Sequence, residues 1–238
     1  MPDYPDLTIS TCRQTALDFV KEMRRKGLNV VLAVNAAPWK PWEKPFTQPY
    51  ATGIGLAVAD HEVVSPPDGR PSLIWKNDGK MEMRIVNVGE ELKDIQLAVS
   101  GFQFILRDGK TTVDDNPRLE PRTFYGLSRD RHSLYLVTVD GRQKDYSEGM
   151  ALNEGAQYLK HFGAADAINM DGGGSTSLVI FNPAKGAPEL VNLPPGTGLP
   201  RASRAVANSL GVYYAGPPTI KPVSGKRAAS EPPAPPVQ

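Results

Sequence analysis

The segment Asn169-Met170-Asp171-Gly172-Gly173-Gly174-Ser175 constrains the fold more than any other part of the chain. It follows a short apolar run at 167–170 and precedes another at 178–181, and each run predicts a buried strand. Three successive glycines between strands are costly, because glycine loses the most conformational freedom on folding. They are useful where the backbone approaches a ligand, since bare N–H groups can form a nest for an anion. We therefore interpret the segment as an active-site turn; a plain tight turn would need only one or two glycines.

Common glycine motifs do not account for this turn. No Gly-Lys-Ser/Thr follows the glycines, which excludes a P-loop. The dinucleotide fingerprint Gly-x-Gly-x-x-Gly and the hydrolase elbow Gly-x-Ser-x-Gly both fail at Ser177. Asp171 adds a carboxylate at the strand end, and Ser175 and Thr176 add hydroxyl groups.

Apolar periodicity predicts two helices. One spans 11–27, with Thr11 and Gln14 as a capping box and Gly27 as its end; the other begins near Leu152 and ends at Gly163. Alternating or continuous apolar runs predict strands at 29–34, 54–59, 72–75, 81–86, 97–106, 122–127, 134–139, 167–170, 178–181 and 209–213. The turn residues at 77–79 predict a hairpin of the strands 72–75 and 81–86, and the turn at 129–132 predicts a hairpin of the strands 122–127 and 134–139. We expect a single α+β domain over 1–215, with a mixed, mostly antiparallel sheet packed against the two main helices. Residues 216–238 are rich in proline and predict a disordered tail.

Composition excludes several functions. The net charge of +1 gives no basis for nucleic-acid binding, and no apolar stretch has the roughly 20 residues that span a bilayer. Cys12 is the only cysteine, so the chain has neither an internal disulfide nor a cysteine-based zinc site. The acidic run 114–116 could ligate calcium but is more typical of a surface turn, so we expect no metal and no cofactor. The first residues carry no signal-peptide pattern. The oligomeric state stays open.

Further polar residues stand near the ends of predicted elements: Asn35, Arg122, Asp140, Glu154 and Arg204. Arginine forks match the geometry of phosphate and carboxylate groups. Taken singly, each of these residues is more typical of a surface turn or salt bridge. The three histidines lie in turn-like or helix-surface contexts, and we assign them no role.

Five segments in the same order along the chain resemble the phosphodiester glycosidase family. They are Asn35-Ala36-Ala37, Pro121-Arg122-Thr123, Asp140-Gly141-Arg142 with Ser147-Glu148-Gly149-Met150, Asn169 to Ser175, and Arg204-Ala205-Val206-Ala207-Asn208. The resemblance implies hydrolysis of the bond between the anomeric carbon of a sugar, such as the amino sugar N-acetylglucosamine, and a phosphodiester. It also implies a secreted, periplasmic or envelope location and a sugar-phosphodiester or glycan as the partner.

The resemblance also suggests roles for individual residues. Asp171 is the leading catalytic carboxylate, with Asp140 and Glu154 as candidate partners, because glycoside cleavage usually needs one or two carboxylates. Arg122 and Arg204 are expected to bind the phosphate. Gly172, Gly173, Gly174 and Ser175 are expected to contact the phosphate or the sugar, and Asn35 to orient the substrate.

The sequence departs from the family at the loops expected to flank the turn. Ala37-Pro38-Trp39 replaces the usual residues after Asn-Ala, and Ser100-Gly101-Phe102-Gln103 replaces Ser-Gly-Gly-Pro. Ala151 stands for the usual threonine before the second helix, and strands that usually precede the first helix are expected to be missing. Two other functions stay open: a non-catalytic phosphoglycan-binding module on the same scaffold, and an envelope-assembly protein tethered by its proline-rich end.

Overall fold

The computed structural model describes residues 10–44, 46–195 and 203–214. The predicted α+β class is confirmed: within these residues two α-helices accompany four sheets in which neighbouring strands pair antiparallel. The predicted tail at 216–238 lies outside the described residues. No helix in the described part of the chain is long and apolar enough to cross a membrane.

The described strands form four sheets. The first sheet contains β1 (Ser10–Cys12), β3 (Trp39–Lys40) and β4 (Tyr50–Gly53). The second contains β5 (Ala57–Ala59), β6 (Glu62–Ser65), β7 (Pro71–Lys76), β8 (Met81–Ile85) and β9 (Ile95–Ser100). The third contains β10 (Gln103–Arg107), β11 (Lys110–Thr111), β12 (Arg122–Ser128), β13 (Leu134–Val139) and β14 (Ala164–Asn169). The fourth contains β2 (Val30–Asn35), β15 (Leu178–Asn182), β16 (Ala187–Leu190) and β17 (Ser209–Tyr213).

The first helix, α1 (Ala16–Arg25), begins later than predicted. Its N-cap is Thr15, whose hydroxyl accepts the Asp18 N–H at 3.1 Å. The predicted capping box at Thr11 is wrong, because Thr11 lies in β1, paired with Ala51 of β4. The predicted end is confirmed: Gly27 adopts φ +89° directly after the C-cap. The second helix, α2 (Leu152–His161), ends as predicted before Gly163, whose φ is +101°.

The two predicted hairpins are present in the structure, whereas two predicted strands differ from it. The hairpins β7–β8 and β12–β13 are confirmed, the second with Arg122 opposite Val139. The predicted strand region at 97–106 is instead two strands in different sheets, because β9 pairs with β7 while β10 pairs with β14. The predicted strand at 54–59 shortens to β5, because Gly55 turns the chain with φ +80°.

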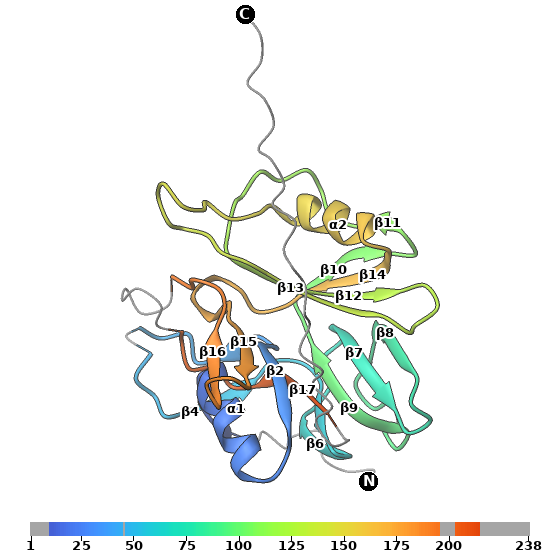
Figure 1. Ribbon diagram of the computed structural model, residues 1–238. Coiled ribbons are helices and arrows are strands. Elements are labelled where there is room, and N and C mark those ends of the chain that lie inside the picture. The colour runs from blue at the N-terminus through green and yellow to red at the C-terminus, as the bar shows by residue number, and fades with distance from the viewer. Residues whose placement is uncertain (1–9, 45, 196–202, 215–238) are drawn as a thin grey trace, which may run out of the picture.

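The second, third and fourth sheets meet around a shared apolar core. Its buried residues include Val34 of β2, Leu73 of β7, Tyr125 of β12 and Ile168 of β14. The two helices cover other surfaces: α1 packs on β2 and β15, and α2 packs on β10, β12 and β14 (Figure 1). The ends of β2 and β14 therefore emerge from the most rigid part of the molecule, and both lead into the candidate site.

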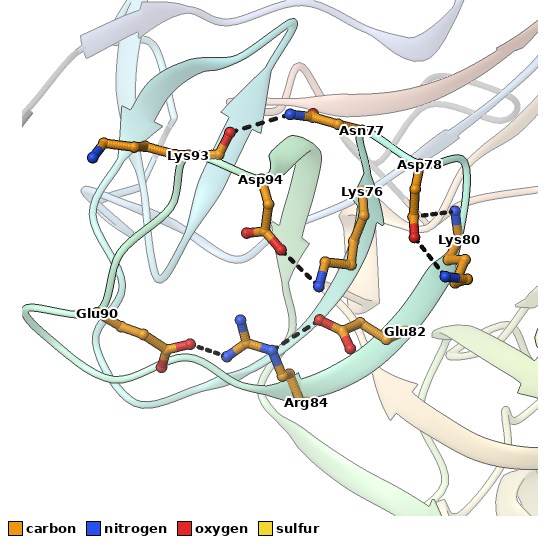
Figure 2. A network of polar contacts seen from close by, with 9 residues as sticks. All are labelled: Lys76, Asn77, Asp78, Lys80, Glu82, Arg84, Glu90, Lys93 and Asp94. Carbon is orange, nitrogen blue, oxygen red and sulfur yellow. Dashed lines mark hydrogen bonds and ion pairs between the residues drawn. The ribbon is translucent and has the colours of Figure 1, made fainter.

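A network of charged side chains covers the hairpin β7–β8 and the segment after it (Figure 2). Arg84 bonds both Glu82 and Glu90, and Lys76 bonds Asp94 at 2.6 Å. These side chains are partly exposed, so solvent screens the pairs and each contributes little to stability. None of them lines the cavity described below.

Candidate active site

The glycine turn begins where β14 ends, and neighbouring strands fix its first residues. The Met170 N–H donates to Thr123 O of β12 at 2.9 Å, and the Asp171 N–H donates to Ala36 O, just after β2, at 3.0 Å. A short 3₁₀ turn, η1 (Gly173–Ser175), follows. Asp171 thus occupies the point where the third and fourth sheets are joined by hydrogen bonds.

Asn35, at the end of β2, lies beneath this turn. Its side chain is fully buried and donates to Asp171 O at 2.7 Å. Its Oδ1 accepts from the Thr123 hydroxyl at 2.7 Å and from the Ser177 N–H at 3.0 Å. These contacts use the amide within the protein, and Asn35 is not among the cavity residues. The structure therefore places it as a support of the turn, away from the substrate contact expected from the sequence.

The Asp171 carboxylate is 8% exposed and faces the cavity. Its Oδ2 accepts from the Trp39 indole N–H at 3.1 Å, and its Oδ1 accepts from the Gly172 N–H at 3.0 Å. Burial raises the pKa of Asp171 to about 6. The nearby Ser175 hydroxyl and the charge of Arg204 oppose this rise, although the hydroxyl has no hydrogen-bond partner of good geometry among the described residues.

The glycines mainly shape the turn. The Gly173 N–H donates to Pro121 O at 2.9 Å, and the Ser175 N–H donates to Gly172 O at 3.1 Å. The Gly172 N–H donates to the Asp171 carboxylate. Among the backbone N–H groups of residues 172–175, only that of Gly174 therefore has no acceptor within the described residues. Gly173 requires its residue type, because φ is +59° and a Cβ would lie 3.2 Å from Arg142 Nη1. The predicted anion nest is thus reduced to one backbone donor.

A cavity of about 990 Å³ opens over the turn. Four arginines line it: Arg118, Arg122, Arg142 and Arg204. Burial lowers the pKa of both Arg122 and Arg204, so these two guanidinium groups are partly desolvated cations. Desolvated guanidinium groups bind phosphate oxygens strongly and in a defined geometry. The structure therefore brings the predicted pair Arg122 and Arg204 together with Asp171.

Glu120 organises two of the arginines. Its Oε1 accepts from Arg118 Nε at 2.9 Å, and its Oε2 accepts from Arg142 Nε. The segment 120–121 can lie this close to the loop that carries Arg142 because Gly149 has no side chain. A Cβ on Gly149 would lie 2.4 Å from the Glu120 carbonyl carbon, and its φ is +119°. The Glu120 carboxylate therefore orients both arginine side chains.

The structure does not bring Asp140 and Glu154 to Asp171, and neither lines the cavity. Asp140 accepts from Asn192 Nδ2 at 2.8 Å and from the Leu193 N–H at 2.9 Å, so it fixes the segment after β16. Glu154 accepts from the Ala151 N–H at 2.8 Å and caps α2. Both carboxylates therefore have structural partners, which fits positioning roles better than the expected catalytic ones.

Sequence reasoning gave no role to several cavity residues. Arg142 belongs to the Asp-Gly-Arg segment, and that position was its only signal. Glu120 had none, because it is one of 26 acidic residues and only tertiary structure turns it toward the arginines. The aromatic wall was also missed; it consists of Trp39, Trp42, Phe46, Phe102 and Phe104. In the described part of the chain, no three acidic, histidine or cysteine side chains gather to hold a metal.

Three solved structures share this fold. The zebrafish N-acetylglucosamine-1-phosphodiester alpha-N-acetylglucosaminidase catalytic domain, auto-inhibited by its pro-peptide, aligns with TM-score 0.66 and 21% identity over 85% of this chain and 67% of that one. A hypothetical protein from Synechocystis aligns with TM-score 0.58 and 13% identity over 87% of this chain and 55% of that one. A putative exported protein from Burkholderia pseudomallei aligns with TM-score 0.58 and 14% identity over 87% of this chain and 69% of that one.

No curated protein sequence matches the chain. The sequence pattern of one family does match, over residues 29–213, and this range contains β2, the glycine turn and all four cavity arginines. The chain therefore belongs to the phosphodiester glycosidase family.

Proposed function

We propose that this protein hydrolyses the bond between the anomeric carbon of a sugar and a phosphodiester. One observation carries the proposal: Asp171, a buried carboxylate, lines the same cavity as three arginines, Arg122, Arg142 and Arg204. A phosphodiester carries one negative charge, which matches partly desolvated guanidinium groups. The adjoining anomeric carbon develops positive charge as its bond breaks, and a carboxylate stabilises that charge.

The roles follow from this arrangement. The bond between the anomeric carbon and the bridging oxygen breaks, and its electron pair leaves with the phosphate, which becomes a phosphomonoester. A water oxygen bonds to the anomeric carbon and its proton passes to a base. Because phosphate is a good leaving group, Asp171 acts in its ionised form, beside the carbon. The arginines and the Gly174 N–H hold the phosphate oxygens.

The finer substrate assignment rests on family membership. The zebrafish relative is named for action on an N-acetylglucosamine-1-phosphodiester. We assign an amino sugar of this class to the present chain as well. The Burkholderia relative is described as a putative exported protein, and the same compartment, outside the cytoplasm, suits a glycan-derived phosphodiester.

Replacement of the central carboxylate tests the proposal. Asp171→Asn should lower kcat/KM for a sugar phosphodiester by about a hundredfold or more. The matched control is Asp60→Asn, an exposed aspartate outside the cavity, which should keep parental activity. In the parent protein, kcat/KM should rise with pH through an apparent pKa of about 6, because the ionised carboxylate is the active form. Near-parental hydrolysis by a folded Asp171→Asn variant would refute the assignment.

A binding module on the same scaffold is the second candidate. The observation in its favour is that Asp140 and Glu154 are held in structural contacts outside the cavity, so neither of the two predicted partner carboxylates adjoins Asp171. The two candidates differ in turnover. Binding of phosphodiester-linked amino sugars without release of phosphomonoester, across a panel of aglycones, would favour the module.

A further inference from the structure

Two aromatic side chains form a corner at the rim of the cavity. The rings of Trp42 and Phe102 have centroids 6.2 Å apart and planes inclined by 60°. Both line the cavity, and Trp42 is 57% exposed. An indole ring left this open to water loses the stabilisation of burial. Two large rings therefore present an exposed apolar surface in the same cavity as the arginines.

Contacts along the chain link this corner to the Asp171 carboxylate and to Arg204. The Phe102 N–H donates to Asn169 O at 2.7 Å, two residues before Asp171. Trp42 lies on the segment that runs from β3 to β4 and begins at Trp39 of β3, the hydrogen-bond partner of Asp171.

Phe46 of that same segment packs edge-on against Trp39, and the Arg204 guanidinium lies over its ring at 4.3 Å. A single segment thus contacts the carboxylate and one phosphate-binding arginine, and carries one wall of the corner.

We propose that this corner is the subsite for the second group of the phosphodiester, and that it selects groups with a flat, apolar ring face. The inference rests on the proposed function. A phosphodiester links its two groups through separate ester oxygens of one tetrahedral phosphorus. If the sugar lies at Asp171 and the phosphate at Arg122, Arg142 and Arg204, the rest of the lining combines polar residues with the aromatic residues, and the exposed ring of Trp42 offers the flat apolar face. A ring stacked on one wall would meet the edge of the other.

Two kinds of group share this chemistry: a nucleoside base and the apolar face of a second sugar ring. Three substrates with one amino sugar separate them: a nucleoside diphosphate diester, a diester to a methyl hexoside, and a methyl diester that lacks any second ring. We expect the parent protein to prefer at least one ring-bearing diester over the methyl diester in kcat/KM. Trp42→Ala and Phe102→Ala should each reduce that preference by about tenfold, since aromatic stacking on a base contributes about 1–3 kcal/mol.

Trp75→Ala is the matched control, because Trp75 is an exposed tryptophan on β7 that does not line the cavity. It should leave the preference at its parental value, while Trp42→Phe should retain most of it. The proposal is overturned if the parent shows no preference, or if the Trp42 and Phe102 variants slow all three substrates equally. The identity of the preferred ring then assigns the base or the sugar.

Failure of the proposed function gives a different result. If the parent hydrolyses none of the three diesters, binding of the same compounds to the parent is measured by calorimetry. A ring-dependent affinity that falls in Trp42→Ala but not in Trp75→Ala supports the subsite without the hydrolase. Equal affinities for the ring-bearing and methyl diesters overturn it.

Discussion

At the scale of single residues, Asn35 does more for the site than its place in a short motif indicates. One buried amide satisfies Asp171 O, the Thr123 hydroxyl and the Ser177 N–H, which come from three separate parts of the chain. A strand-ending asparagine could be recognised from the sequence. Its partners could not, because they lie 88 to 142 residues away.

Removal of this amide should destabilise the whole protein. Asn35→Ala leaves several buried polar groups without partners, and each costs about 1–3 kcal/mol, so we expect a loss of about 3 kcal/mol or more in the free energy of unfolding. Asn77→Ala, at an exposed turn position, should change it by less than about 0.5 kcal/mol. Chemical denaturation measures both. A loss for Asn35→Ala as small as that of Asn77→Ala would contradict the supporting role.

The titration of Asp171 predicts a pH dependence of stability. Its pKa is raised from 3.8 to about 6 in the folded state, so the folded protein holds this proton more tightly than the unfolded chain. The resulting stabilisation is fully present below about pH 4 and is lost as the pH rises through about 6. Relative to Asp171→Asn, the parent should lose about 2 kcal/mol between pH 4 and pH 7. A difference between the two proteins that does not change with pH would refute the raised pKa.

At the scale of elements, the glycine turn and the β15–β16 hairpin offer a matched comparison. Gly173 and Gly186 have nearly equal φ values, +59° and +62°. A Cβ on Gly173 would lie 3.2 Å from Arg142, whereas a Cβ on Gly186 would meet nothing within 4 Å.

Alanine at either position should cost about 1 kcal/mol of stability, because both adopt the left-handed conformation. Only Gly173→Ala should also impair catalysis, because it displaces the Arg142 guanidinium; we expect a KM increase of about tenfold for the phosphodiester. Thermal denaturation and steady-state kinetics on both variants separate the two effects. Equal activities of the two variants would show that Arg142 does not serve the substrate.

At the scale of the whole molecule, charge is distributed unevenly. The chain has a net charge of +1, yet the described cavity lining carries Lys44 and four arginines against Asp114, Glu120 and Asp171. The total charge therefore hides a local excess of positive charge, which a low-dielectric cavity focuses on an incoming anion.

Salt should reveal this local charge. Between about 20 and 200 mM sodium chloride we expect kcat/KM for an anionic diester to fall several-fold, while kcat changes little, because screening weakens the attraction before binding. Kinetics at fixed pH across this range provide the measurement, and Lys93→Ala, at an exposed lysine outside the cavity, serves as the control. A kcat/KM independent of salt would mean that the arginines do not attract the substrate.

Sequence alone determined the local features. These are the α+β class, the hairpins at β7–β8 and β12–β13, the C-terminal ends of the two helices, the glycine turn and the family. Each of these features depends on residue preferences or on spacing between residues that are close together in the sequence. Tertiary structure decided which polar groups share the cavity. It brought Arg122 and Arg204 to Asp171 and added Arg142 and Glu120, while Asp140 and Glu154 were bound elsewhere. Those outcomes depend on hydrogen bonds between segments far apart in the chain, and no local pattern encodes which donor meets which acceptor.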